Sequence, residues 1–196
     1  VDPNNPNIIW YGSIRAGLQK GVNSGGTWTW SQVPASSVPF GVAAKKGGEA
    51  GVTFVLCDAN EGQTITYAGV FDAGSSPRTG GVYKTTDGTN WTKVSMSSGS
   101  FNTPRRAQMA SNGTLYITGG GEGVFKLPRG GSMSAITPSI SKAYFNGVAV
   151  DPNDADGNIV YVADKASKKM WRSADGGTTW AEQNSTSHDR QEPDGT

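Results

Sequence analysis

The segment "NIVYVADKASKKMWRSADGGTTW", residues 158–180, decides the fold, because its main features recur along the chain. It opens on an apolar, β-branched run centred on an aromatic residue, Tyr161, and the next apolar run carries a basic residue, Arg172. A turn rich in small residues follows and ends on Trp180. Runs of β-branched and aromatic residues between turn-forming residues predict short strands.

Two elements of this segment, the aromatic run and the basic run, recur in the same order. The earlier copies are "NIIWYG" with "GLQKG" (Trp10, Lys20), "TITYAG" with "GVYKT" (Tyr67, Lys84), and "GTLYIT" with "GVFKL" (Tyr116, Lys126). A strand-and-turn signal precedes each pair, and a turn with a further short strand follows it. Four short strands per unit, at a period of roughly 45 to 60 residues, are typical of a β-propeller blade.

We therefore predict an all-β fold, a β-propeller of four-stranded antiparallel blades with Asp-box (BNR-like) repeats. One propeller portion, residues 1–184, would hold about four blades and precede a polar C-terminal tail, 185–196. The predicted blades are approximately 1–36, 51–96, 105–138 and 144–184. The first unit begins where its innermost strand would already have ended, at Asp2-Pro3. We expect the chain to be part of a larger, seven-bladed propeller, and a compact four-bladed ring is the alternative.

Composition and charge limit the possible partners. The chain has 28 Gly, 10 Pro and six Trp, which suits short strands joined by tight turns. A net charge of +1 provides no basic field for nucleic acid, and no apolar run is long enough to span a membrane. With one cysteine, Cys57, and one histidine, His188, we expect no metal site, no cofactor and no serine or cysteine triad. A neutral or weakly charged partner fits better.

The turn "SADGGTTW", Ser173–Trp180, resembles the Asp box of bacterial neuraminidase-type repeats. Weaker copies are "GVNSGGTW", residues 21–28, and "TTDGTNW", residues 85–91; we call the three segments the box turns. A carboxylate here can accept hydrogen bonds from its own turn, and the tryptophan can pack on the sheet. Because the motif recurs in copies that match it less well, we interpret it as structural rather than catalytic. The residues given this role are Asn23, Trp28, Asp87, Trp91, Ser173, Asp175, Gly177 and Trp180.

If the box turns lie on one face, the other strand connections lie on the opposite face, where a propeller presents a groove. Exposed aromatics beside carboxylates and amides suit stacking on sugars and hydrogen bonding to them, and the near-neutral charge fits a neutral polysaccharide. The carbohydrate-binding candidates are Arg15, Asp72, Arg78, Arg106, Tyr144, Asn146 and Asp164, with Ser13, Arg105 and the turn 119–122 beside them.

Over nearly its whole length the chain resembles the interior blades of the N-terminal propeller of glycoside hydrolase family 74. The Asp boxes are the less specific part of this resemblance. The order of segments, particularly "PRRAQMASNGTLYIT" followed by "GVAVDP", is more specific. The resemblance implies a secreted or cell-surface, two-propeller endo-β-1,4-glucanase, most often acting on xyloglucan.

The resemblance also implies an inverting hydrolysis by two aspartates, one from the first blade of each propeller, within a Thr-Asp-Ile-Gly-Gly-like segment. Nothing here reproduces that segment. The nearest match is Phe71-Asp72-Ala73-Gly74, which lies in a later blade, and we assign no catalytic role to it. We expect this chain to supply groove loops and neither catalytic acid.

Three hypotheses follow for the function. The leading one is a fragment of a xyloglucanase-like hydrolase, whose partners would be a β-glucan and the rest of the parent propeller or a second propeller. The alternative is a non-catalytic Asp-box propeller that acts as an adhesion, assembly or surface-layer module. A sialidase-like propeller ranks third, because no Arg-Ile-Pro segment opens the chain. We expect neither nucleic acid nor a membrane as a partner.

Overall fold

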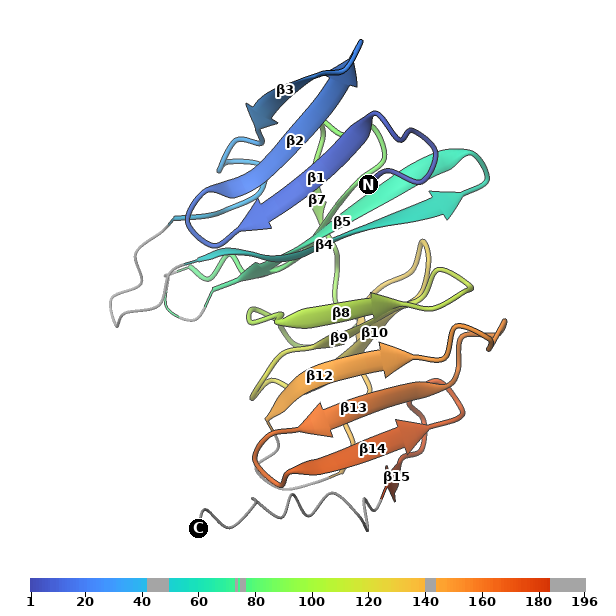
Figure 1. The fold of residues 1–196 in the computed structure, drawn as a ribbon. Helices are drawn as coiled ribbons and strands as arrows, with labels where there is room; N and C mark the ends of the chain where they lie inside the picture. Colours follow the sequence, from blue (N-terminus) through green and yellow to red (C-terminus); the bar gives the residue numbers. More distant parts are fainter. Residues whose placement is uncertain (42–49, 73, 75–76, 140–143, 184–196) are drawn as a thin grey trace, which may run out of the picture.

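The computed structural model describes residues 1–41, 50–72, 74, 77–139 and 144–183, so the predicted tail 185–196 lies outside the described residues. Within these ranges the chain forms fifteen strands in four antiparallel sheets and no helix. Figure 1 shows the four sheets following one another along the molecule. The predicted all-β fold of antiparallel propeller blades is confirmed, and we call the sheets blades 1 to 4 in chain order.

The strands of each blade follow chain order from one edge to the other. Blade 1 has β1 (Ile8–Ser13), β2 (Gly17–Ser24) and β3 (Thr27–Gln32). Blade 2 has β4 (Gly51–Asn60), β5 (Gln63–Phe71), β6 (Gly81–Thr85) and β7 (Thr92–Lys93). Blade 3 has β8 (Arg106–Met109), β9 (Leu115–Thr118), β10 (Val124–Leu127) and β11 (Ser134–Ala135). Blade 4 has β12 (Phe145–Val150), β13 (Val160–Asp164), β14 (Lys169–Ser173) and β15 (Ala181–Gln183).

The aromatic and basic residues of each repeat lie directly opposite one another on neighbouring strands. We call them the aromatic–base pairs: Trp10 with Lys20, Tyr67 with Lys84, Tyr116 with Lys126, and Tyr161 with Arg172. In blades 1, 3 and 4 the cationic group lies 5.4, 5.7 and 5.8 Å from the centre of its partner's ring. Cross-strand pairs of this kind stabilise a sheet, which explains why both elements recur together.

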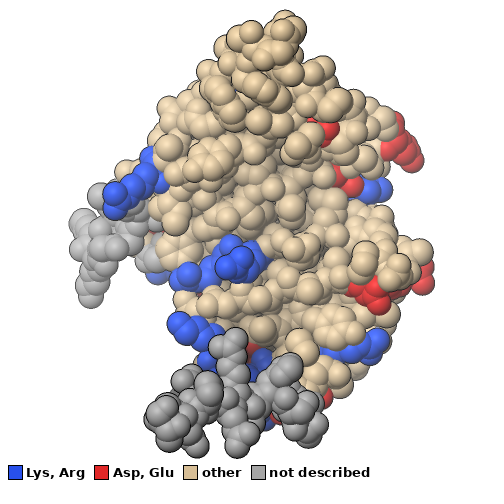
Figure 2. Space-filling model, viewed as in Figure 1, with Lys and Arg blue, Asp and Glu red and all other residues tan. Residues whose placement is uncertain are grey.

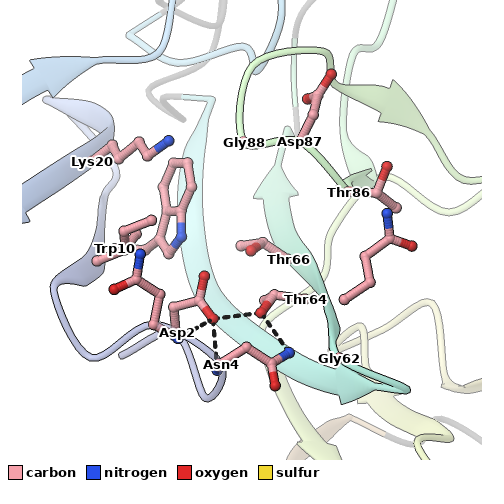
Figure 3. A pocket seen from close by; sticks show the side chains of 13 residues that line it. Asp2, Asn4, Trp10, Lys20, Gly62, Thr64, Thr66, Thr86, Asp87 and Gly88 are labelled. Atoms are coloured by element: carbon pink, nitrogen blue, oxygen red, sulfur yellow. Dashed lines mark hydrogen bonds between the residues drawn. The ribbon is translucent and has the colours of Figure 1, made fainter.

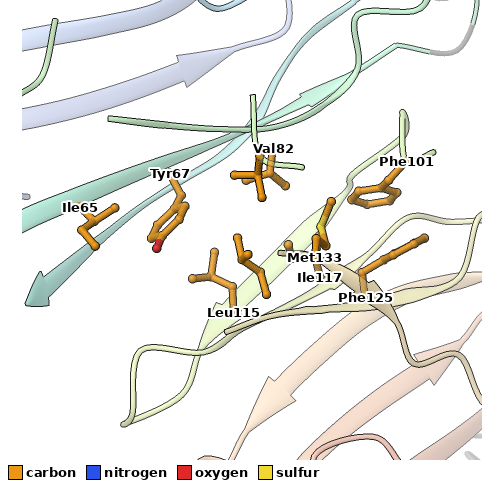
Figure 4. Close-up of a cluster of buried hydrophobic side chains, with 10 residues drawn as sticks. Ile65, Tyr67, Val82, Phe101, Leu115, Ile117, Phe125 and Met133 are labelled. Atoms are coloured by element: carbon orange, nitrogen blue, oxygen red, sulfur yellow. The ribbon is translucent and has the colours of Figure 1, made fainter. Parts of the chain in front are cut away.

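The core lies between the blades rather than within any one of them. Figure 4 shows the cluster between blades 2 and 3, where Tyr67 and Val82 face Leu115 and Ile117. Two further clusters, between blades 1 and 2 and between blades 3 and 4, are built in the same way. Each blade therefore buries its apolar faces against its neighbours.

Blade 3 has no box turn and is joined to blade 2 by an ion pair. Nε and Nη2 of Arg129, in the turn after β10, each lie 2.6 Å from one carboxylate oxygen of Asp58 on β4. The side chain of Asp58 is 4% exposed and that of Arg129 is 32% exposed. Hydrogen bonding to this buried carboxylate raises the pKa of Arg129. The pair is bidentate, which fixes orientation as well as distance.

Leu115→Ala should test the core between blades 2 and 3, because Leu115 is fully buried. The substitution removes apolar contacts and leaves a cavity, so we expect the free energy of unfolding to fall by about 2–5 kcal/mol. Urea denaturation measures the change. The matched control is Ile14→Ala at a position that is 46% exposed, where a change below about 0.5 kcal/mol is expected. Equal effects at the two positions would contradict the assignment.

Arg129→Met should leave the Asp58 carboxylate buried without its cation. We expect a loss of about 3 kcal/mol in the free energy of unfolding, the lower end of the range for a broken buried pair, because Arg129 is partly exposed. The control is Lys169→Met, which breaks the exposed pair with Glu182 and should cost less than about 1 kcal/mol. Addition of Asp58→Asn should recover part of the loss, and no recovery would argue against the pair.

Candidate functional site

The box turns and the other strand connections lie on opposite sides of the molecule. In Figure 1 the ends of β1, β5, β9 and β13 lie on the left, together with the starts of β8 and β12. The ends of β2 and β14, where box turns begin, lie on the right. We call the left-hand side, with the predicted carbohydrate-binding residues, the groove face.

Two hollows on the groove face contain most of the candidates. The first has a volume of about 660 Å³ and is lined by residues of all four blades, among them Ser13, Thr53, Arg106 and Asn146. The second, of about 280 Å³, is lined by Arg78 and Tyr144 among others. Arg105 lines both hollows, so the two are neighbours, and we treat them together as one candidate site, which we call the groove.

Arg105 is the centre of this groove. Its guanidinium group lies 5.0 Å from the ring centre of Phe71 and 5.3 Å from that of Tyr144. Its backbone N–H donates to the carbonyl of Thr118 at 2.8 Å, which ties the residue to the end of β9. Contact with two aromatic rings limits the conformations of the long side chain, while its N–H groups can still donate hydrogen bonds.

Sequence reasoning named Arg105 only as a neighbour of the candidates and missed Phe71. Phe71 ends β5 in blade 2, whereas Tyr144 precedes β12 in blade 4. No local pattern joins these residues, because the contact depends on three successive blades. Their position at the ends of predicted strands, where aromatic and basic residues can meet, is the signal that would have pointed to Arg105 and Phe71.

Asp72 and Asp164 are buried, and their carboxylates hold the turns around them. Asp72 accepts hydrogen bonds from the backbone of Gly74 and from both the backbone and the hydroxyl of Thr79, at 2.7–3.1 Å. Asp164 accepts from the backbone N–H groups of Ala166, Ser167 and Tyr144, the last at 2.6 Å. We assign both to positioning the loops, and their predicted contact with carbohydrate stays a prediction.

The pKa of Asp164 agrees with this role. Burial acts to raise it, but hydrogen bonds from Ser167, Tyr144 and Ala166 outweigh burial and lower the pKa below the ordinary aspartate value. Asp164 is therefore held as a carboxylate, and through the backbone of Tyr144 it places that ring at the edge of the groove.

Glu122 has the same function in blade 3. Its Oε2 accepts from the backbone N–H groups of Asn102 and Thr103 at 2.9 and 2.7 Å, and from the Thr103 hydroxyl at 2.7 Å. It thus holds the connection that leads into β8. Arg15 lies in the turn after β1, and its backbone N–H donates to the Ser13 hydroxyl at 3.3 Å. Arg15, Asp72 and Asp164 do not line either hollow.

Charge differs between the two sides of the molecule. In Figure 2 lysine and arginine side chains gather on the left and around the start of β8, while the acidic side chains in view lie mostly on the right. Two of the groove-face carboxylates, Asp72 and Asp164, are buried in their turns. Three arginines, Arg78, Arg105 and Arg106, and one carboxylate, that of Glu122, line the two hollows.

The box turn of blade 4 is held by its own side chains. Ser173 donates to Asp175 at 2.8 Å, and Asp175 accepts from the backbone N–H and the hydroxyl of Thr179 at 2.8 and 2.6 Å. The backbone N–H of Gly177 donates to the Ser173 hydroxyl, and Gly177 has a φ of 92°, which favours glycine. The indole N–H of Trp180 donates to the carbonyl of Ile136 in blade 3 at 2.8 Å.

The other two box turns differ in detail. Asp87 accepts from the backbone of Thr89 and from the backbone and side chain of Asn90, at 2.7–2.8 Å, and Trp91 packs against blade 1. In blade 1, Asn23 accepts a hydrogen bond from Gly26 at 3.0 Å within a tight hairpin, and Trp28 lies in β3. The structural role of the predicted residues stays a prediction, and Trp28 is 38% exposed.

A further hollow, of about 530 Å³, lies between blades 1 and 2 near the box turn of blade 2. Figure 3 shows Trp10, Lys20 and Asp87 around it. Three of its polar residues bind one another: Asp2 accepts from the backbone of Asn4 and from the Thr64 hydroxyl, and the Asn4 amide donates to Thr64.

Among the described residues, no three histidine, cysteine, aspartate or glutamate side chains come together as a metal site would require. In the same ranges no helix is long and apolar enough to cross a membrane.

Comparison with known proteins relates the chain to enzymes named as xyloglucanases. No family model matches the sequence. A probable oligoxyloglucan-reducing end-specific xyloglucanase of Neosartorya fischeri is 29% identical over 92% of this chain and 26% of its own length. Xyloglucanase Xgh74A of Acetivibrio thermocellus is 31% identical over 92% of this chain and 24% of its own length. The chain thus spans about a quarter of the length of these relatives.

Asp175 should make stability depend on pH in the acid range. Hydrogen bonds from Thr179 and Ser173 lower its pKa from 3.8 to about 2, because these donors bind the ionised carboxylate more strongly than the protonated acid. The stabilisation is fully present above pH 3.8 and is lost as pH falls toward about 2. Thermal denaturation of the native chain and of Asp175→Asn across this range measures it.

Asp175→Asn should be less stable at neutral pH and should lose less stability than the native chain as the solution is acidified. Asp156→Asn, at an exposed position, is the control and should follow the native curve. Parallel curves for the native chain and Asp175→Asn would show that the carboxylate does not stabilise the turn.

Proposed function

We propose that this chain forms part of the polysaccharide-binding groove of a xyloglucan-degrading glycoside hydrolase. The observation that carries the proposal is the similarity to two enzymes named as xyloglucanases over 92% of the chain. The groove is the second support, because it joins planar side chains and hydrogen-bond donors on the face opposite the box turns.

The groove has the two kinds of group that a neutral sugar chain requires. The Tyr144 ring and the Arg105 guanidinium group are planar and can stack on the apolar faces of pyranose rings. Arg78 and Arg106 can donate to sugar hydroxyls, and the Asn146 amide can both donate and accept. The first hollow, lined from all four blades, suits an extended chain rather than a single sugar.

In this proposal the chain binds substrate and the acid and base come from elsewhere in the parent protein. Inverting hydrolysis needs two carboxyl groups about 6.5–9.5 Å apart, with room for a water. Of the described groove-face carboxylates, Asp72, Glu122 and Asp164 bind amides of the surrounding loops. We further propose that the parent protein is an endo-β-1,4-glucanase. It would be secreted or displayed at the cell surface, because an enzyme encounters a polymeric substrate outside the cell.

Tyr144→Ala should weaken binding of xyloglucan oligosaccharides to this chain. Loss of a stacking ring should lower the affinity about tenfold, which corresponds to about 1.4 kcal/mol. Isothermal titration calorimetry measures the affinity, with cello-oligosaccharides of equal backbone length as a second ligand. Tyr11→Ala is the matched control, because Tyr11 is 58% exposed and belongs to another face of the molecule.

The proposal fails if the native chain binds no β-glucan, or if Tyr144→Ala and Arg105→Ala bind as the native chain does. Binding without hydrolysis by a longer parent chain would instead favour a non-catalytic module. Hydrolysis of a sialoside by that parent would favour a sialidase.

A further inference from the structure

The second hollow of the groove, of about 280 Å³, brings two arginines together with two aromatic rings. Arg78 comes from the connection between β5 and β6 and Arg105 from the segment that leads into β8, and both line the hollow beside Phe71 and Tyr144. Tyr144 faces blade 3, because a side chain added at Gly120 would lie 3.1 Å from its ring. The hollow is thus formed where blades 2, 3 and 4 meet, and not by the outer faces of blades 1 and 4.

The guanidinium group of Arg105 has no anionic partner among the described residues. It lies over the rings of Phe71 and Tyr144, and its side chain forms no ion pair or hydrogen bond within the same ranges. Arg105 is half-buried, and a charge withdrawn from water is costly unless it is paired or hydrogen-bonded. Contacts with ring faces leave the N–H groups of a guanidinium group able to donate in its plane.

Arg78 adds a second positive charge to the hollow. It is exposed, and its side chain likewise forms no ion pair or hydrogen bond with a described residue. The carboxylate in the lining belongs to Glu122, whose Oε2 accepts from the backbone N–H groups of Asn102 and Thr103 rather than from an arginine. The hollow therefore has two cations and one anion in its lining, and that anion already binds the backbone of its own blade.

Backbone rather than side chains forms one wall of the hollow. Gly119 and Gly121 line it, and a side chain added at Gly120 would come within 2.9 Å of Nε of Arg105. Gly120 has a φ of 55°, in the region that favours glycine. These glycines allow the Arg105 side chain to pack close to this segment and leave room for a ligand beside its guanidinium group.

A carboxylate is the ligand group that matches this arrangement. Two parallel hydrogen bonds from an arginine to a carboxylate are short, charge-assisted and directional. Arg78 can supply the second positive charge, and the Tyr144 ring can stack on the sugar ring that carries the carboxylate. At about 280 Å³ the hollow suits one sugar residue, because pockets for drug-sized ligands begin at about 300 Å³.

We propose that the second hollow binds the carboxylate of a hexuronic acid carried as a branch on the glucan chain. A net charge of +1 predicts a neutral polysaccharide, but that sum includes carboxylates that are buried in their turns, such as Asp72 and Asp164. The neutral backbone would lie in the first hollow and the acidic branch in the second, with Arg105 between them. The assignment to a glucan rests on the proposed function, whereas the carboxylate site rests on the two arginines.

Isothermal titration calorimetry with the 196-residue chain tests the proposal. The two ligands are a xyloglucan oligosaccharide and the same oligosaccharide after oxidation of one terminal branch sugar at C6 to the uronic acid. The native chain should bind the acidic ligand about tenfold more tightly, because hydrogen bonds between charged groups are stronger than those to a neutral hydroxyl. The preference should shrink as the salt concentration is raised from about 0.05 to 0.5 M, since salt screens exposed charges.

The ratio of the two affinities identifies the groups responsible. Arg105→Gln keeps a planar hydrogen-bond donor but removes the charge, so the ratio should fall to about one even where both affinities drop. Arg78→Gln changes an exposed position and should lower the ratio without disturbing the fold, which circular dichroism checks. Lys165→Gln is the matched control and should keep the native ratio, because it removes the same charge from an exposed position after β13, outside both hollows.

The outcomes separate this inference from the proposed function. Equal affinity of the native chain for the two ligands overturns the inference and leaves the proposed function standing, whereas binding of neither ligand overturns both. A ratio unchanged in Arg105→Gln and Arg78→Gln also overturns it. Sialyllactose is the third ligand, because sialic acid carries the same group on another kind of glycan. Tighter binding of sialyllactose than of the acidic oligosaccharide overturns the assignment to a glucan branch.

Discussion

Burial of apolar surface between neighbouring blades is the interaction on which this structure depends. A three- or four-stranded sheet cannot bury both of its faces alone, and each of the three clusters of buried side chains draws its residues from two neighbouring blades. The aromatic–base pairs contribute twice, once across strands within a blade and once as the surface on which the next blade lies. The groove follows from this stacking, because only successive blades bring the Arg105, Phe71 and Tyr144 side chains together.

The repeated part of the fold could be predicted from sequence because its interactions are local. Aromatic and basic residues that recur at similar spacing face each other across a hairpin, and the observed pairing of Tyr161 with Arg172 follows directly from that spacing. The box turns also use partners within a few residues of Asp87 and Asp175. Short-range contacts of this kind leave a pattern in the sequence.

The remaining contacts left no such pattern. Asp58 and Arg129 lie in different repeats, and nothing near either residue in the sequence points to the other. Asp72 directly follows β5 and Asp164 ends β13, each at the start of a polar segment. Both therefore resemble solvated loop residues in sequence, yet both are buried. Their hydrogen-bonding role depends on how each turn folds back, which composition does not show.

The Asp58–Arg129 pair has a consequence for assembly. Box turns and aromatic–base pairs are alike from blade to blade, so apolar contact alone would accept several orders of stacking. A buried carboxylate accepts only a neighbour that supplies a guanidinium group at the right place, and among the described blades that neighbour is blade 3. Among the described blades, the ion pair thus forms only when blade 3 lies next to blade 2. It distinguishes the native order of blades from any arrangement in which similar units have exchanged places.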